Sequence, residues 1–122
     1  EYDKAELIYK QVLGIREKKL GIDHPNTATS LCNLAGLYAD KDDYASAEPL
    51  YKQALAIREK ALGPEHPDIA NSLNNLAGLY ATKGEKGKAK ELWERALKIL
   101  KKSLPPEHLH IKLVKNNLKG LE

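Results

Sequence analysis

Apolar residues recur along the chain at intervals of three and four positions, the spacing that places side chains on one face of an α-helix. One such stripe comprises Tyr44, Ala47, Tyr51, Ala54, Leu55, Arg58 and Leu62, and Arg58 is its single polar member. A second stripe comprises Ala70, Leu73, Leu76, Ala77 and Tyr80. No segment alternates as a β-strand does. The pattern predicts an all-α protein with helices near 2–20, 25–40, 44–62, 67–83, 86–104 and 107–120.

Glycine and proline mark where these helices end and begin. Gly63 follows one stripe, and glycine is favoured just past a helix C-terminus. Pro67 opens the next stripe, where a proline in the first helical turn is tolerated. The connections are only a few residues long, so successive helices should pack as antiparallel neighbours.

The pattern is also periodic on a longer scale. Residues 1–42 return in register as residues 43–84, with 26 of the 42 positions identical, and a weaker third copy runs from residue 85 to the end. A period of this length is typical of stacked helical repeats. We therefore expect an α-solenoid of antiparallel helix pairs with about six helices. It would form a single array over residues 1–122: a partial repeat 1–20, repeats 25–62 and 67–104, and a capping helix 107–121.

Composition narrows the class of partner. The net charge of +3 is too small to indicate nucleic acid, and no apolar run reaches the roughly 20 residues that a membrane span needs. Residues 85–122 carry a charge of +5 and residues 1–84 a charge of −2. That basic end fits either solubility or an acidic partner or membrane surface. The single cysteine, Cys32, favours a reduced, cytoplasmic setting.

Small and large residues recur at fixed spacings, and these spacings resemble those of a known protein family. Leu31-x2-Leu34-Ala35-x2-Tyr38 recurs as Leu73-x2-Leu76-Ala77-x2-Tyr80. Ala47-x3-Tyr51-x2-Ala54 recurs as Ala89-x3-Trp93-x2-Ala96. These patterns resemble the tetratricopeptide repeat (TPR), in which small residues let paired helices approach closely. The 42-residue period and the Leu-Gly-x-[Asp/Glu]-His-Pro linker resemble the repeats of kinesin light chain and nephrocystin-3-like proteins.

The resemblance implies a protein-binding surface, because the first helix of each pair lines the concave face in this family. Its key position is an asparagine, found here as Asn33, Asn75 and Asn117. One turn earlier lie Thr29 and Asn71, and the neighbouring position adds Asn74 and Asn116. An amide both donates and accepts, so a row of them suits the backbone of an extended peptide. The alternative is that these amides cap local backbone or bond across helices. The tryptophan-plus-acidic ligands of kinesin light chains are not expected, because the inner helices hold few cations.

The two ends of the array depart from the repeat in different ways. Lys115 and Lys119 replace leucine and alanine of the earlier copies, which predicts a solvent-facing last helix. The 2–20 helix lacks a preceding partner helix, which suggests a fragment with an open apolar edge. We expect that edge to support end-to-end packing or a homodimer.

Catalytic and metal sites are weakly indicated. The linker histidines are a full repeat apart, on the order of 10 Å, too far for shared zinc coordination. We expect each His-Pro to set its turn. Cys32 has no evident companion base, so an enzyme is not expected, nor is a cofactor. The sequence thus predicts a module that binds a peptide or partner segment, or alternatively a structural spacer or self-association segment of a larger protein.

Overall fold

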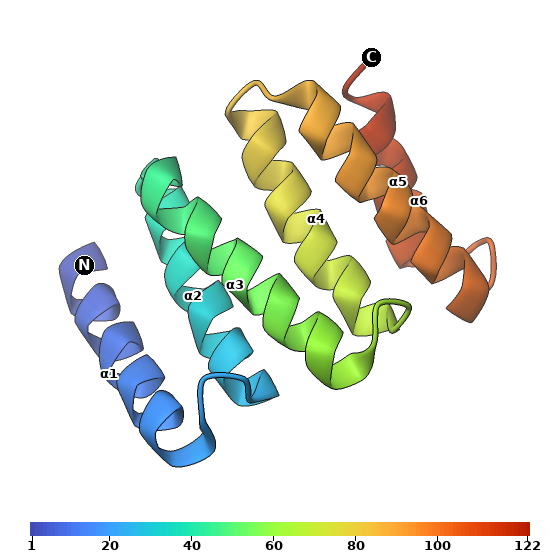
Figure 1. Ribbon diagram of the computed structural model, residues 1–122. Helices are drawn as coiled ribbons and strands as arrows, with labels where there is room; N and C mark the ends of the chain where they lie inside the picture. The colour runs from blue at the N-terminus through green and yellow to red at the C-terminus, as the bar shows by residue number, and fades with distance from the viewer. The chain divides into compact units, whose positions relative to one another are not determined.

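The computed structural model describes residues 1–122 and contains six α-helices and no strand. The helices are α1 (Tyr2–Leu20), α2 (Pro25–Asp40), α3 (Tyr44–Leu62), α4 (Pro67–Thr82), α5 (Lys86–Ser103) and α6 (Leu109–Lys119) (Figure 1). Five agree with the predicted bounds within one residue. Helix α6 begins two residues later than predicted, because His108 adopts the extended conformation of an N-cap. None of the six is both long and apolar enough to span a membrane.

The helices form two compact units, residues 1–63 with α1–α3 and residues 64–122 with α4–α6. Within each unit, helices that follow one another in sequence pack side by side in opposite directions (Figure 1). The expected antiparallel packing of neighbours is therefore confirmed inside each unit.

Histidines start three of the helices. His24, His66 and His108 are N-caps with extended backbone, and their Nδ1 atoms accept from the amides of Asn26, Asp68 and His110 at 3.0, 3.1 and 3.1 Å. Each bond satisfies one of the amides that a helix leaves unpaired at its N-terminus. The expectation that His-Pro sets the turn is confirmed, and the imidazole adds the cap itself.

The core consists of the small and large residues that carry the repeat pattern. Alanines with 0% exposure line the helix contacts: Ala28, Ala35, Ala47, Ala54, Ala77, Ala89 and Ala96. Leu31, Leu73 and Trp93 fill the space between them and are at most 5% exposed. Because alanine has no side chain beyond Cβ, the helix backbones can approach closely.

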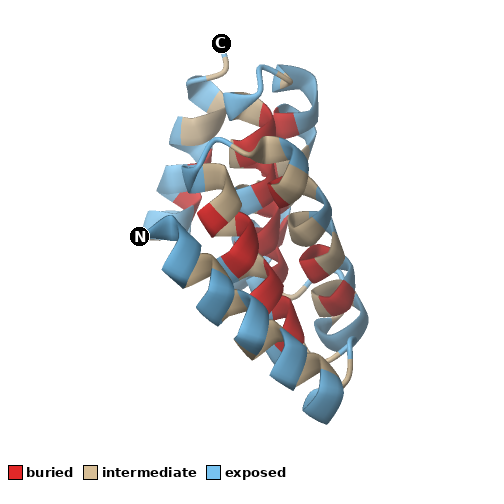
Figure 2. Ribbon diagram, turned by 90° about the vertical axis from the view of Figure 1, so that its left-hand side faces the viewer, coloured by how far each residue is buried: buried red, intermediate tan, exposed pale blue.

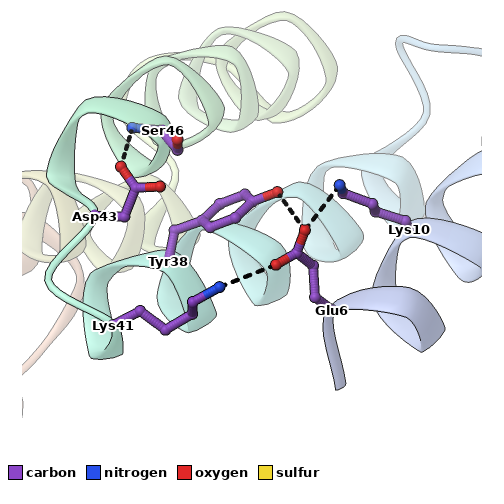
Figure 3. Close-up of polar contacts among 6 residues, drawn as sticks. All are labelled: Glu6, Lys10, Tyr38, Lys41, Asp43 and Ser46. Carbon is purple, nitrogen blue, oxygen red and sulfur yellow. Dashed lines mark hydrogen bonds and ion pairs between the residues drawn. The ribbon is translucent and has the colours of Figure 1, made fainter. Parts of the chain in front are cut away.

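Helix α1 differs from the others in having no buried residue (Figure 2). It is held to α2 by the partly buried Leu13, which packs against the cluster containing Ala28 and Leu31, and by polar contacts. Glu6 accepts from the Tyr38 hydroxyl and from Lys41 at 3.2 Å each, and it pairs with Lys10 at 2.8 Å (Figure 3). Near the other end, Arg16 donates to Ser30 Oγ at 2.8 Å. These contacts fix one side of α1 and leave its opposite side uncovered.

Candidate functional site

In unit 1, the predicted site residues lie on the solvent side of α2. Thr29 and Asn33 are exposed and one helical turn apart. The Asn33 amide makes no hydrogen bond within the protein. Arg58 reaches across from α3 and donates to Thr29 Oγ1 at 3.3 Å. The unit therefore presents an amide, a hydroxyl and a guanidinium beside one another.

Cys32 borders this surface but is half-buried. Burial raises the pKa of its thiol, and the neighbouring Arg58 lowers it by less. The thiol is therefore held in its protonated, poorly nucleophilic form at neutral pH. Burial likewise raises the pKa of Tyr51, whose hydroxyl lies 3.5 Å from where a Cβ on Gly36 would be. The hydroxyl of Tyr51 thus lies against Gly36 of α2.

In unit 2, Asn71 and Asn75 occupy the corresponding exposed positions of α4. Neither amide is bonded within the protein. A side chain added at Gly78, three residues after Asn75, would meet no atom within 4 Å. Glycine inside a helix costs about 1 kcal/mol relative to alanine. Close contact with another helix therefore does not account for Gly78.

Asn74 and Asn117, in contrast, form hydrogen bonds between helices. The Asn74 Oδ1 atom accepts from Trp93 Nε1 at 2.7 Å and from Asn117 Nδ2 at 3.2 Å. These bonds tie α4 to α5 and α6. Both amides thus bond across helices. This was the alternative to peptide binding that the sequence allowed for the repeated asparagines. Asn116 is exposed on α6.

The structure therefore separates the seven predicted residues. Thr29 and Asn33 lie together in unit 1, as do Asn71 and Asn75 in unit 2, whereas Asn74 and Asn117 are joined inside the packing of unit 2. Two neighbours were not predicted, Arg58 and Trp93. The sequence did contain a signal for Arg58, because it is the one polar residue in an otherwise apolar stripe. The equivalent residue of the next repeat is Leu100.

No group of three or more histidine, cysteine, aspartate or glutamate side chains lies close enough to hold a metal ion. The His108 and His110 rings meet edge to face with centroids 4.9 Å apart, but the Nδ1 of His108 is engaged in the helix cap. His24, His66 and His108 cap their helices.

Known proteins with this fold are repeat proteins. The profile of the tetratricopeptide repeat matches residues 1–60 and again residues 33–102. The nearly identical TPR-like repeats of a predicted kinesin light chain from Podospora anserina superpose with a TM-score of 0.89 at 31% identity over 98% of this chain. A substituted form of the same repeats gives a TM-score of 0.88 at the same identity and coverage. BtubC (BKLC) from P. vanneervenii gives 0.90 at 25% identity, also over 98%.

A search of curated proteins finds no match. The chain spans 57% of the Podospora structures and 48% of BtubC. The profile covers most of the chain, and the sequence spacing, the helix pairs and the superpositions agree with it. The expected all-α helical-repeat fold is confirmed, and the fold class is one that typically serves as a scaffold for protein interactions. This chain belongs to the tetratricopeptide repeat family.

Proposed function

We propose that the chain is a protein-interaction module in which each unit binds a stretch of partner polypeptide, on α2 in unit 1 and on α4 in unit 2. Asn33 and Asn75 carry the proposal, because they occupy the same repeat position, are exposed, and have amides with no partner inside the protein. Thr29 and Asn71, one turn earlier, would add a second contact in each unit. Asn116 supplies a further exposed amide on α6.

An asparagine amide can donate to a peptide carbonyl and accept from a peptide amide, so it holds backbone without reading a side chain. The open space at Gly78 supports this reading, because a peptide backbone approaches closely where no Cβ projects. Asn74 and Asn117 would support the surface from within by fixing α4 against α5 and α6. The single cysteine supports a reducing compartment such as the cytoplasm as the setting.

A random peptide library displayed on phage, selected against the whole chain, supplies ligands for the test. Each hydrogen bond to a neutral partner contributes about 1 kcal/mol, so Asn33→Ala and Asn75→Ala should each weaken binding about five- to tenfold. Isothermal titration calorimetry measures the change. Asn26→Ala is the matched control, since Asn26 is also exposed on α2 but lies outside the site. If the double variant binds the selected peptides as well as the unchanged chain does, the spacer or self-association role replaces this proposal.

A further inference from the structure

The C-terminal half of α5 carries cations that the equivalent helices of the repeat lack. The cations are Arg95, Lys98, Lys101 and Lys102, which we call the basic end of α5. The equivalent residues are Gln53, Ala56, Glu59 and Lys60 in α3, and Gln11, Gly14, Glu17 and Lys18 in α1. Two copies of the repeat thus hold one cation and one carboxylate at positions where the third copy holds only cations.

The fold itself does not explain this group of cations. Arg95, Lys98 and Lys102 are three and four residues apart, and like charges at that spacing on a helix surface repel one another. Cations are favoured near a helix C-terminus, but α3 ends with Lys60 as its single last-turn cation. Lys98 and Lys101 are exposed, and neither forms an ion pair within the protein. The basic end therefore has capacity for an anion from outside the chain.

A carboxylate of the protein shows how this surface binds an anion. Glu65, in the linker before α4, forms an ion pair with Lys102. The hydrogen bond from Lys102 lowers the pKa of the Glu65 carboxyl, and the charges of Lys98 and Arg95 lower it as well. The Arg95 guanidinium donates to the Pro64 carbonyl at 3.5 Å, which keeps it beside the linker. One carboxylate thus lies among several cations and neutralises only one of them.

We propose that the basic end of α5 is a docking surface for a short acidic segment of a partner protein. The carboxylates of that segment pair with Lys98 and Lys101 and continue the row that Glu65 begins on Lys102. This surface belongs to α5, whereas the proposed function uses residues of α2 and α4, so the two proposals do not depend on each other.

Other anionic partners fit this surface less well. Glu91 and Glu94 are exposed on α5 immediately before the basic end. A membrane surface or a nucleic acid is a continuous array of negative charge and would be repelled by these two carboxylates, whereas a short segment can end before them. In addition, no large apolar side chain of α5 is exposed that could enter a bilayer.

A second copy of the chain is also a poor occupant. Its densest acidic segment is residues 40–43, in the turn between α2 and α3, and Lys41 lies within that segment. Asp42 accepts from the Tyr44 hydroxyl at 3.0 Å, and Asp43 accepts from the Ser46 amide at 3.2 Å as the cap of α3. Docking this turn on the basic end would compete with both hydrogen bonds and bring Lys41 against like charges.

Fluorescence anisotropy of a labelled deca-glutamate peptide with the whole chain tests the proposal. Binding should be saturable, and Lys98→Ala/Lys101→Glu should weaken it roughly tenfold, because attractive contacts are lost and a repulsive one is added. These are the residues of α3, or their charge equivalents, at the same positions, so circular dichroism should show an unchanged helix content. Lys101→Glu alone repeats the test should the double variant not fold.

Lys86→Ala/Lys90→Glu is the matched control, because it lowers the net charge equally at exposed positions of the same helix. It should weaken binding no more than about twofold, since Lys86 and Lys90 lie at the opposite end of α5. Equal weakening by both double variants would assign the binding to net charge and overturn the proposal, as would the absence of saturable binding. Asn33→Ala and Asn75→Ala should leave binding of this peptide unchanged, so its failure is distinguishable from failure of the proposed function.

The remaining occupants are tested with the same variants. Vesicles containing phosphatidylserine, or duplex DNA, should bind no better to the unchanged chain than to Lys98→Ala/Lys101→Glu. Binding of either that depends on these lysines and that the peptide does not displace would assign the surface to another class of partner. A dimer in sedimentation velocity that the same double variant dissociates would identify a second copy as the occupant. Each of these two results overturns the proposal.

Discussion

Residues at equivalent positions of the repeat have different neighbours and different hydrogen bonds. Cys32 in unit 1 and Asn74 in unit 2 share a position, yet the first lies beside Arg58 and the second bonds to Trp93 and Asn117. A guanidinium thus lies beside this position in unit 1, whereas Leu100 occupies the place of Arg58 in the next repeat. A partner that contacts both surfaces would meet a different chemistry on each, although the backbone positions correspond.

Glu6 gives a residue-scale prediction about pH. Hydrogen bonds from Lys10 and Lys41 lower the pKa of its carboxyl from 4.5 to about 2. The folded state thus favours the ionised form, and the resulting stability is present above about pH 4.5 and is lost as the pH falls toward 2. Glu6→Gln should lower the free energy of unfolding at pH 7, and the difference from the unchanged chain should vanish near pH 2. Thermal unfolding followed by circular dichroism measures both.

The matched control for Glu6 is Glu107→Gln, since Glu107 is exposed and forms no ion pair in the structure. Its effect on stability should be small at every pH. A difference between Glu6→Gln and the unchanged chain that persists unaltered at pH 2 would contradict the role given to the Glu6 carboxylate.

The sequence alone predicts the residues whose type is dictated by packing. The alanines and leucines of the repeat were predicted to be interior, and they are buried, because only small or shape-matched side chains fit between close helices. It could not decide the partners of polar side chains. Asn74 and Asn75 are adjacent and chemically identical in sequence, yet one is bonded inside the fold and the other faces solvent. That difference depends on where Trp93 of another helix lies.

At the scale of helices, the ends were predictable because their signals are local. Gly63 adopts a φ of 90°, which L side chains rarely adopt, and α3 ends there. The start of α6 was placed too early because proline is absent after His108, and the cap itself needed the imidazole geometry to be seen. Local sequence signals thus predict where the helices lie. The histidine cap of α6 is evident only in the structure.

Pro49 leads to a prediction for helix α3. It is the sixth residue of α3 and is exposed, so its ring removes an amide from the helix interior without any buried contact in return. The equivalent residues of α1 and α5 are Leu7 and Glu91. Pro49→Ala should raise the free energy of unfolding by about 2–3 kcal/mol, the order of the interior proline penalty. Urea denaturation measures the change.

Pro67→Ala serves as the control for Pro49, because Pro67 is the first residue of α4 and needs no intrahelical hydrogen bond there. Its effect should be well under that of Pro49→Ala. If Pro49→Ala leaves stability unchanged or lowers it, α3 has accommodated the proline at no cost.

For the whole molecule, the two terminal helices have opposite character. Helix α1 leaves Leu7, Ile8 and Ile15 uncovered, while α6 presents Lys112, Lys115 and Lys119. The sequence predicted both features, since each is a departure from an internal repeat. The two helices thus expose side chains of opposite character, apolar on α1 and cationic on α6. A heterologous contact between α6 of one copy and α1 of another could extend without limit. The α6 lysines disfavour that contact, because burying an ammonium group without a counter-charge is costly.

We expect these three lysines to keep copies of the chain from packing end to end. Replacing them with their counterparts in α2, as Lys112→Ala, Lys115→Leu and Lys119→Ala, gives α6 the residues that cover Ile57 in unit 1. The triple variant should form oligomers whose size grows with concentration, whereas the unchanged chain should not, and sedimentation velocity distinguishes them. Adding Ile15→Lys should return the triple variant to its starting size, because the same α1 surface receives the new helix. Aggregation that Ile15→Lys leaves intact would show that the contact lies elsewhere than on α1.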